Sequence, residues 1–234
     1  MNEEKKQRVV VIPGDEIGAS GLKSGSGTYR RDGKVFAAQL GIRNVRGDFV
    51  NVIPLGGRYI PRSGDSVIGV VVEMGPSNWL VDINSPYPAP MHVSEVPWKV
   101  EFGDTARYLT IGDAILAKVL AVDEIKHVQV TMKEHGLRKL AGGQLVEISH
   151  SKVPRMIGKG GSMIALLKDA TKCRIFVGQN GRVWLDGEQD NMMKATQAIK
   201  RIDEASQHFG LTEEIKKMLN FSGAVTPQGD KDGE

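Results

Sequence analysis

The sequence has one cysteine and no long hydrophobic run, and each absence excludes a class of protein. Cys173 has no second cysteine for an internal disulfide and fits no zinc pattern, so we expect a reduced thiol in a protein core. No apolar stretch approaches the roughly 20 residues that a membrane helix needs. The opening residues, Met-Asn-Glu-Glu-Lys-Lys, do not resemble a signal peptide. Together these features predict a cytoplasmic protein.

Patterns typical of catalysis and metal binding are also missing. The five histidines show no paired metal-ligand spacing, and none stands beside Cys173. The acidic residues are scattered along the chain, and each is most simply explained as a surface charge. We therefore expect no catalytic residues, no metal site and no cofactor.

Glycine, by contrast, is abundant, and positive charge is concentrated in one segment. The chain has 28 glycines among 234 residues, which is typical of proteins built from strands and tight turns. Its net charge is only +3, but the segment from Lys126 to Arg182 holds 11 basic and 3 acidic residues, a net charge of +8. Such a block is typical of a surface that binds nucleic-acid phosphates. It is equally compatible with a solvated face that only keeps the protein soluble.

The first 135 residues read as short strands separated by glycine turns. Three strands are expected near the start, at 8–12, 34–38 and 49–53, with a loop at 23–27. Five more strand-like runs follow, at 66–73, 78–83, 89–93, 113–123 and 127–133. Five short strands in about 70 residues, with a long insertion before the fourth, favour an OB-type barrel.

After Gln144 the pattern changes to mixed α and β structure. It predicts strands at 145–148, 174–177 and 182–185, and helices at 153–157, 162–171, from Asp190 to Gly210 and at 212–219. Asn180-Gly181 between two of these strands is a strong hairpin signal. Residues 222–234 are expected to be disordered.

A glycine loop between the first two of these helices carries the clearest functional signal. Gly158, Lys159, Gly160 and Gly161 would present backbone N–H groups at a helix N-terminus, where the helix dipole favours phosphate. The lysine can add a charge-assisted contact. The spacing fits neither a Walker loop nor a dinucleotide-binding fingerprint, but a glycine-rich turn of purely structural role remains an alternative.

The pattern Ile-Gly-x-x-Gly-x-x-Ile, with this order of elements, resembles a KH domain of the eukaryotic (type I) topology over roughly 144–207. Such loops clamp about four nucleotides of a single strand against an apolar groove. The resemblance implies that Arg155 and the loop from Gly158 to Gly161 contact RNA. Only one cation, Lys159, is available inside the loop.

The barrel segment resembles the S-one type of OB domain. The resemblance rests on 66–72, 79–83, 91–96 and 111–119, and it implies that Trp79 and His92 face RNA. Aromatic side chains in such domains stack on bases. The insertion between 96 and 110 corresponds to a loop beside the nucleic-acid path, so Arg107 and Tyr108 are further candidate contacts.

The whole arrangement resembles one family, the Rrp-four-type RNA-binding cap subunits of the archaeal exosome, in which the opening Ile12-Pro13-Gly14-Asp15 and the segment Gly178-Gln179-Asn180-Gly181 find counterparts. The resemblance implies a multidomain protein, mainly β plus α+β. Its expected parts are a small N-terminal β domain (1–60), a five-stranded OB-type barrel (61–143), a type I KH domain (144–210) and a short helix with a disordered tail (211–234).

The same resemblance implies a non-catalytic role. Three copies would sit on a hexameric ring of ribonuclease-PH-like subunits, which degrades RNA from the 3′ end by phosphorolysis, and would capture single-stranded RNA and guide it into the ring. Two other functions remain open. One is a free-standing translation or transcription factor, and the other is a mainly structural clamp in which the KH domain has become a docking surface.

Overall fold

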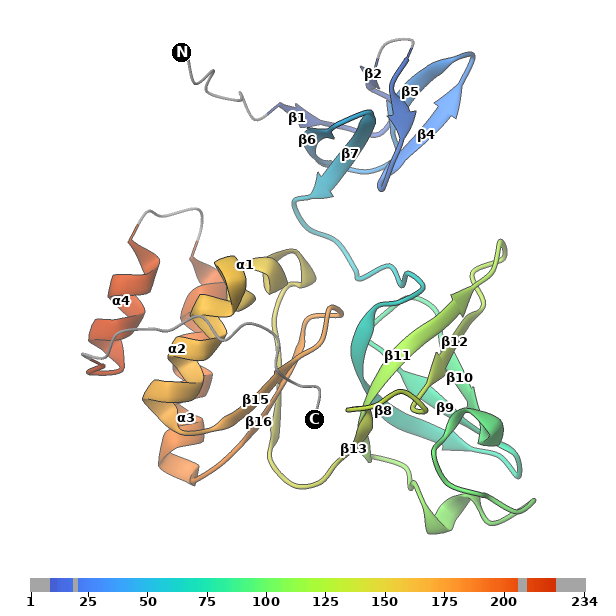
Figure 1. The fold of residues 1–234 in the computed structure, drawn as a ribbon, viewed down its shortest axis with the longest axis vertical. Coiled ribbons are helices and arrows are strands. Elements are labelled where there is room, and N and C mark those ends of the chain that lie inside the picture. Colours follow the sequence, from blue (N-terminus) through green and yellow to red (C-terminus); the bar gives the residue numbers. More distant parts are fainter. Residues whose placement is uncertain (1–8, 19–20, 206–209, 222–234) are drawn as a thin grey trace. The chain divides into compact units, whose positions relative to one another are not determined.

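The computed structural model describes residues 9–18, 21–205 and 210–221, and it divides into two compact units, Met1–Gly57 and Arg58–Glu234 (Figure 1). The first boundary was expected at residue 60. The first compact unit ends at Gly57, and Tyr59 packs into the barrel core of the second unit. The barrel and the KH domain, expected as separate domains, form one compact unit. The predicted disordered tail, 222–234, lies outside the described residues.

The N-terminal unit consists of short strands around a small core. A four-stranded sheet has the order β1-β6-β7-β3, and a three-stranded sheet has the order β2-β5-β4. The strands are β1 (Val10–Val11), β2 (Glu16–Gly18), β3 (Lys23–Ser24), β4 (Thr28–Arg31), β5 (Lys34–Ala37), β6 (Gly41–Arg46) and β7 (Phe49–Pro54). The core consists of Val11, Ile17, Val35, Ala37, Val50 and Val52. The sequence did not predict β2, β3, β4 and β6, and the expected loop at 23–27 contains β3. In β4 no residue is buried, so it carries no alternating apolar pattern.

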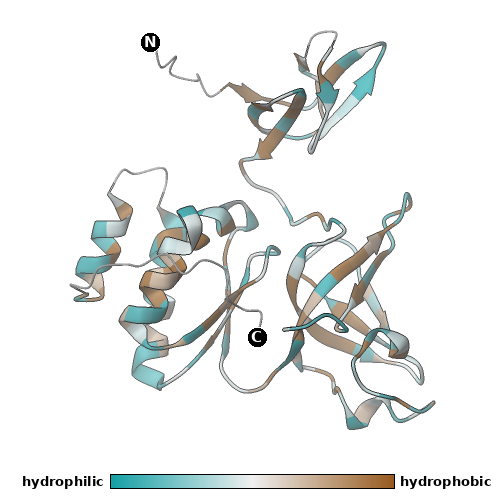
Figure 2. Ribbon diagram, viewed as in Figure 1, coloured by the Kyte–Doolittle hydropathy of each residue, from teal (hydrophilic) through white to brown (hydrophobic). Residues whose placement is uncertain are grey.

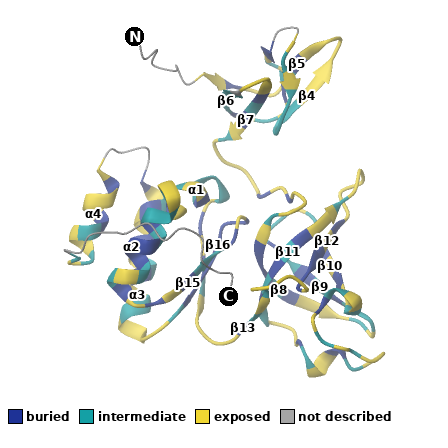
Figure 3. Cartoon of the chain, in the orientation of Figure 1, coloured by how far each residue is buried: buried dark blue, intermediate teal, exposed yellow. Residues whose placement is uncertain are grey.

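The second unit begins with an antiparallel barrel in the strand order β10-β9-β8-β11-β12. The strands are β8 (Ser66–Met74), β9 (Asn78–Asp82), β10 (Ala89–His92), β11 (Ala114–Val122) and β12 (Val128–Thr131). Apolar side chains of these strands form the barrel core. Figure 2 shows the hydrophobic residues along the strands, and Figure 3 shows which residues are buried. A sixth strand, β13 (Arg138–Leu140), pairs with the first half of β11 and was not predicted.

Three glycine-aspartate turns precede strands in the same geometry. In each turn the aspartate carboxylate accepts a hydrogen bond from the backbone N–H three residues earlier, and the intervening glycine has positive φ. The bonds are Ile12 N to Asp15 (2.9 Å), Arg62 N to Asp65 (3.1 Å) and Thr110 N to Asp113 (2.7 Å). The glycines are Gly14, Gly64 and Gly112, with φ of 94°, 90° and 91°. The shared sequence pattern therefore reflects one turn geometry used three times.

The KH domain has a three-stranded antiparallel sheet in the order β14-β16-β15, with helices on one face. Its elements are β14 (Gln144–Glu147), α1 (Val153–Ile157), α2 (Ser162–Thr171), β15 (Arg174–Val177), β16 (Arg182–Asp186), α3 (Gln189–Glu204) and α4 (Leu211–Met218). α4 belongs to this domain, because Leu211 and Ile215 are buried in the same core as α2 and α3. Sheet order and helix placement are those of the type I arrangement that the sequence predicted.

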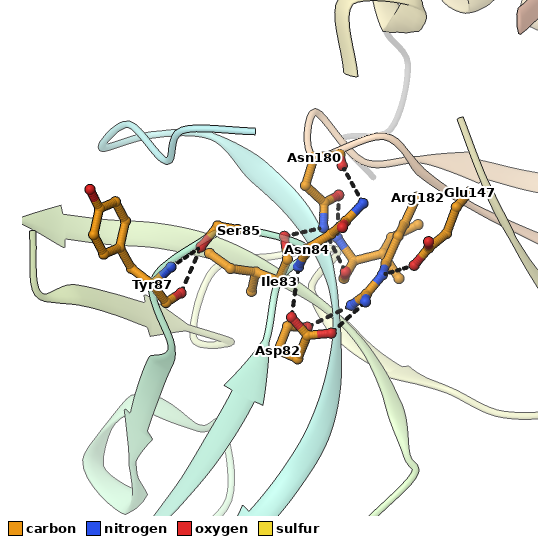
Figure 4. Close-up of polar contacts among 9 residues, drawn as sticks. Asp82, Ile83, Asn84, Ser85, Tyr87, Glu147, Asn180 and Arg182 are labelled. Atoms are coloured by element: carbon orange, nitrogen blue, oxygen red, sulfur yellow. Dashed lines mark hydrogen bonds and ion pairs between the residues drawn. The ribbon is translucent and has the colours of Figure 1, made fainter. Parts of the chain in front are cut away.

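The barrel and the KH domain are joined by a buried polar junction (Figure 4). The side-chain amide of Asn180, fully buried, donates to the carbonyl oxygens of Ile68 (2.8 Å) and Ile83 (2.9 Å) and accepts from Ile68 N (3.3 Å). Next to it, Arg182 bridges Asp82 of the barrel (2.5 Å) and Glu147 of the KH domain (3.0 Å). Because buried polar groups are costly to leave unpaired, these bonds hold the two domains in one arrangement.

Candidate nucleic-acid interface

The glycine loop of the KH domain lies between α1 and α2, as predicted. Three of its residues have positive φ: Gly158 (79°), Gly160 (59°) and Gly161 (77°). Positive φ at three of the four loop residues turns the chain sharply between the two helices, and glycine adopts such φ values most readily. The N-terminal turn of α2 therefore follows directly on the loop, and its backbone N–H groups face the position where a phosphate could bind.

The glycines of this loop serve two different purposes. A Cβ atom at Gly158 would lie 2.7 Å from the backbone nitrogen of Met163, so this position needs glycine for close packing. A Cβ atom at Gly160 would meet nothing within 4 Å, so that position is open to solvent. The loop thus has one side packed on α2 and one side exposed, as a surface approached by a nucleic-acid backbone requires.

Some basic side chains in and around the loop are available to a ligand, and others are paired with carboxylates. Lys159 is exposed and has no hydrogen-bond or ion-pair partner among the described residues, while Arg155 is half-buried on α1. Elsewhere in the basic block, acidic groups neutralise three cations: Lys139 pairs with Asp113, Arg174 with Asp186, and Arg182 with Asp82 and Glu147. The net charge of the block therefore overstates the number of cations available to a ligand.

The pair of Lys139 and Asp113 also lowers the pKa of the Asp113 carboxyl group. Although partial burial raises the pKa of Asp113, hydrogen bonds from the Lys139 ammonium (2.5 Å) and from Thr110 outweigh this effect and hold the pKa below its usual value. Asp113 therefore stays ionised and fixes the turn that leads into β11.

The structure corrects the prediction that Trp79 stacks on RNA. Trp79 is fully buried in the barrel, and its indole N–H donates to the carbonyl of Leu109 at 3.2 Å. Successive strand residues face opposite sides of a sheet, and Trp79 shares its side with Val81, which is also fully buried. The ring therefore fills the barrel interior, where no base can reach it. On the outward side of β9 stand Asn78 and Leu80.

His92 is exposed at the end of β10, and one side of its ring is already used. Its Nδ1 accepts a hydrogen bond from Ser94 N (3.1 Å), so that His92 caps the turn Val93–Glu95, and it lies 2.9 Å from Ser94 Oγ. The contact between His92 and RNA stays a prediction. The second ring nitrogen and the exposed face of the ring are available for it.

Arg107 and Tyr108 lie in the long loop between β10 and β11. The Arg107 side chain is 75% exposed but pairs with Asp104 at 3.0 Å. Tyr108 is half-buried, stacks on Trp98 with ring centroids 5.6 Å apart, and donates its hydroxyl to Lys99 O at 2.8 Å. The two remain predicted contacts on the rim of the barrel. Their neighbour Phe102, which is 83% exposed, was not among the predicted contacts. Its position near the other aromatic residues of this loop is the sequence feature that could have indicated it.

The predicted residues therefore do not form a single site. Arg155 and the loop from Gly158 to Gly161 lie together on the KH domain, whereas His92, Arg107 and Tyr108 lie on the barrel. Within the described residues, no group of three or more His, Cys, Asp or Glu side chains could hold a metal ion. In the same part of the chain, no helix is long and apolar enough to cross a membrane.

Comparison with known proteins identifies all three parts of the chain. Residues 10–46 match the exosome complex exonuclease RRP4 N-terminal region, residues 58–121 match the RRP4 S1 domain, and residues 143–191 match the KH domain. A solved structure of an exosome complex RNA-binding protein superposes with a TM-score of 0.65 at 41% identity, covering 70% of this chain and 96% of that one. The predicted barrel and KH folds are thus confirmed.

Full-length relatives agree with these domain matches. The exosome complex component Rrp4 of Thermoplasma acidophilum is 45% identical over 225 residues, which cover 96% of this chain and 93% of that protein. The component of the same name from Methanosarcina barkeri is 45% identical over 210 residues, covering 90% and 81% of the two chains. The chain belongs to the Rrp4 family of exosome complex components.

Proposed function

We propose that this chain is the RNA-binding cap subunit of an exosome and that it captures single-stranded RNA without catalysing its degradation. The observation that carries the proposal is the loop from Gly158 to Gly161, with its open Gly160, its unpaired Lys159 and the N-terminus of α2 behind it. A single strand can bring its phosphates to such a loop, whereas a duplex holds its phosphates at a fixed spacing on a broad surface.

Catalysis in this proposal belongs to partner subunits. Three copies of the chain sit on a hexameric ring of ribonuclease-PH-like subunits in the cytoplasm, and the ring degrades RNA from the 3′ end by phosphorolysis. The family membership supports this arrangement, because the relatives are named as components of the exosome complex. Basic residues near the entry attract RNA by releasing its counterions, which makes capture sensitive to salt.

The N-terminal unit offers a surface for attachment to the ring. Val10, Ile42 and Ile53 lie directly opposite one another on β1, β6 and β7. Val10 is 58% exposed and Ile53 48% exposed, and the neighbouring Ile12 and Leu40 are exposed as well. A row of exposed aliphatic side chains on one sheet is typical of a protein-protein contact.

The RNA-binding claim is tested by placing negative charge in the loop. The double substitution Lys159→Asp with Gly160→Asp should weaken binding of a labelled single-stranded RNA at least tenfold in fluorescence anisotropy, since it replaces an attraction to phosphate by repulsion. Aspartate is among the residues that tolerate the left-handed conformation of Gly160, and space is open there, so the fold should survive.

A matched control separates a local effect from a change in overall charge. Gln197→Asp with Lys200→Asp alters the net charge by the same amount on the exposed face of α3 and should leave RNA affinity within about twofold. Equal affinities for the wild type and the loop variant would favour the alternative in which the KH domain is a structural clamp.

Attachment to the ring is tested on the apolar row. Ile53→Asp puts a charge in the proposed contact and should abolish co-elution of the chain with a ring reconstituted from the ribonuclease-PH-like subunits. Ile125→Asp, at a 74% exposed position in the loop between β11 and β12, is the control and should co-elute normally. If Ile53→Asp co-elutes as well as the control, the N-terminal sheet is not the attachment surface.

A further inference from the structure

A stack of four side chains crosses the line where the barrel meets the KH sheet. The guanidinium of Arg138, on β13, lies over the ring of Phe176, on β15, at 4.9 Å from its centroid. The Phe176 ring contacts Trp184 on β16, with centroids 5.7 Å apart. The guanidinium of Arg174 lies 5.9 Å from the Trp184 ring. Cationic groups at such distances are attracted by the ring faces, so both arginines are held in defined positions.

The two arginines differ in what neutralises them. Arg174 pairs with Asp186 through its Nε (2.8 Å) and its terminal nitrogen. Arg138 is exposed and pairs with no carboxylate among the described residues. The next residue, Lys139, is bound to Asp113. Arg138 is therefore a cation with a fixed position and a free charge, which is the combination that a ligand of opposite charge requires.

The base of the stack is rigid. Trp184 is 3% exposed, its indole N–H donates to Gly142 O at 2.9 Å, and it packs with Ile68 and Leu140 in a core shared by the barrel and the KH sheet. Phe176 is half-buried and stands on the edge strand of its sheet, so no further strand covers it within the described residues. The guanidinium consequently rests on a ring that is packed against the buried Trp184.

We propose that Arg138, seated on Phe176, is a phosphate-binding site for single-stranded RNA at the seam between barrel and KH domain. This proposal rests on the proposed function, and it adds a contact outside the glycine loop. With one face of the guanidinium on the ring, its N–H groups remain directed outward along its edges, where they can donate in pairs to the oxygens of one phosphate. The site would let a strand bound by one domain continue onto the other.

RNA fits this position better than an acidic protein segment does. The free cation lies within the block 126–182, whose net charge of +8 falls to +5 when the three carboxylates that pair with it from outside, Asp82, Asp113 and Asp186, are counted; the remaining positive charge favours a polyanion with regularly spaced charges. The four-membered stack offers no apolar pocket for a protein anchor, because its largest ring, Trp184, is buried.

The test compares the same substitution at the two arginines of the full-length chain. Binding of labelled oligouridylate is measured by fluorescence anisotropy at several salt concentrations. Arg138→Gln should weaken binding about tenfold at low salt and reduce the slope of log Kd against log salt by about 0.7, the value for one phosphate on a single strand. Arg174→Gln is the matched control and should change neither quantity, because Asp186 already neutralises Arg174.

A conservative variant identifies the chemistry. Arg138→Lys keeps the charge but loses the planar paired donors, so it should keep the salt slope and recover only part of the affinity. Unchanged affinity and slope in Arg138→Gln would overturn this proposal. Equal losses of affinity in Arg138→Gln and Arg174→Gln would overturn it too. Both results would leave the proposed function intact. If the wild-type chain bound no RNA at low salt, the proposed function would fail and this proposal with it.

Discussion

The KH domain contains two glycine loops of similar composition that the structure uses in opposite ways. Gly158-Lys159-Gly160-Gly161 lies between two helices, and its middle residues are exposed. Gly178-Gln179-Asn180-Gly181 lies between two strands, and all its residues except Gln179 are buried. A Cβ atom at Gly178 would lie 2.8 Å from Ile68 N, and one at Gly181 would lie 2.3 Å from Ile148 O.

The difference shows that glycine content alone does not reveal what a loop does. In the second loop, the glycines allow close packing, and the side-chain amide of Asn180 forms hydrogen bonds within the protein. Neither is available to a ligand. In the first loop, Gly160 and Lys159 contribute little to the fold and remain available. The loop proposed to bind RNA should therefore keep its stability when Lys159 or Gly160 is replaced, whereas the loop that joins the domains should not tolerate replacement of Asn180.

The largest effect is expected at Asn180. Asn180→Ala removes the partners of two carbonyl groups and one N–H group inside the junction, so we expect the free energy of unfolding to fall by about 3 kcal/mol. Urea denaturation of the full-length chain measures this loss. Gln179→Ala, at the exposed neighbouring position, should cost less than about 0.5 kcal/mol. Similar values for the two variants would contradict the role given to the junction.

A smaller effect is expected at Gly160. Gly160→Ala meets no atom within 4 Å, so its cost comes only from the left-handed backbone and should be about 1 kcal/mol in the same denaturation experiment. A loss as large as that of Asn180→Ala would show that the exposed loop is also needed for the fold, and the contrast between the two loops would fail.

Much of the fold could be predicted from the sequence because local signals coincide with the elements. The ranges expected for α1, α2 and β15 are those observed, since the glycines and the apolar spacing mark their ends. Strand β13 could not be predicted in the same way. Its three residues, Arg138–Leu140, show no alternation, and Leu140 is held by packing on Ile68 and Trp184, which are distant in sequence.

The candidate site was predicted less completely than the fold. The glycine loop was identified because its residues are adjacent in the chain. Trp79 was misassigned, although it has the same parity as the apolar residues Val81 and Ile83, which indicates an inward position. The contact between Arg138 and Phe176 joins residues from different domains, and no local pattern in the sequence links them.

The most direct test of the account compares the affinity of the wild-type chain for a single-stranded RNA and for the duplex of the same sequence, across a salt series. The account predicts that the single strand binds at least tenfold more tightly than the duplex and that its binding weakens steeply with salt. Equal affinity for both forms, or no binding of the single strand at low salt, would contradict the claim that this chain captures single-stranded RNA.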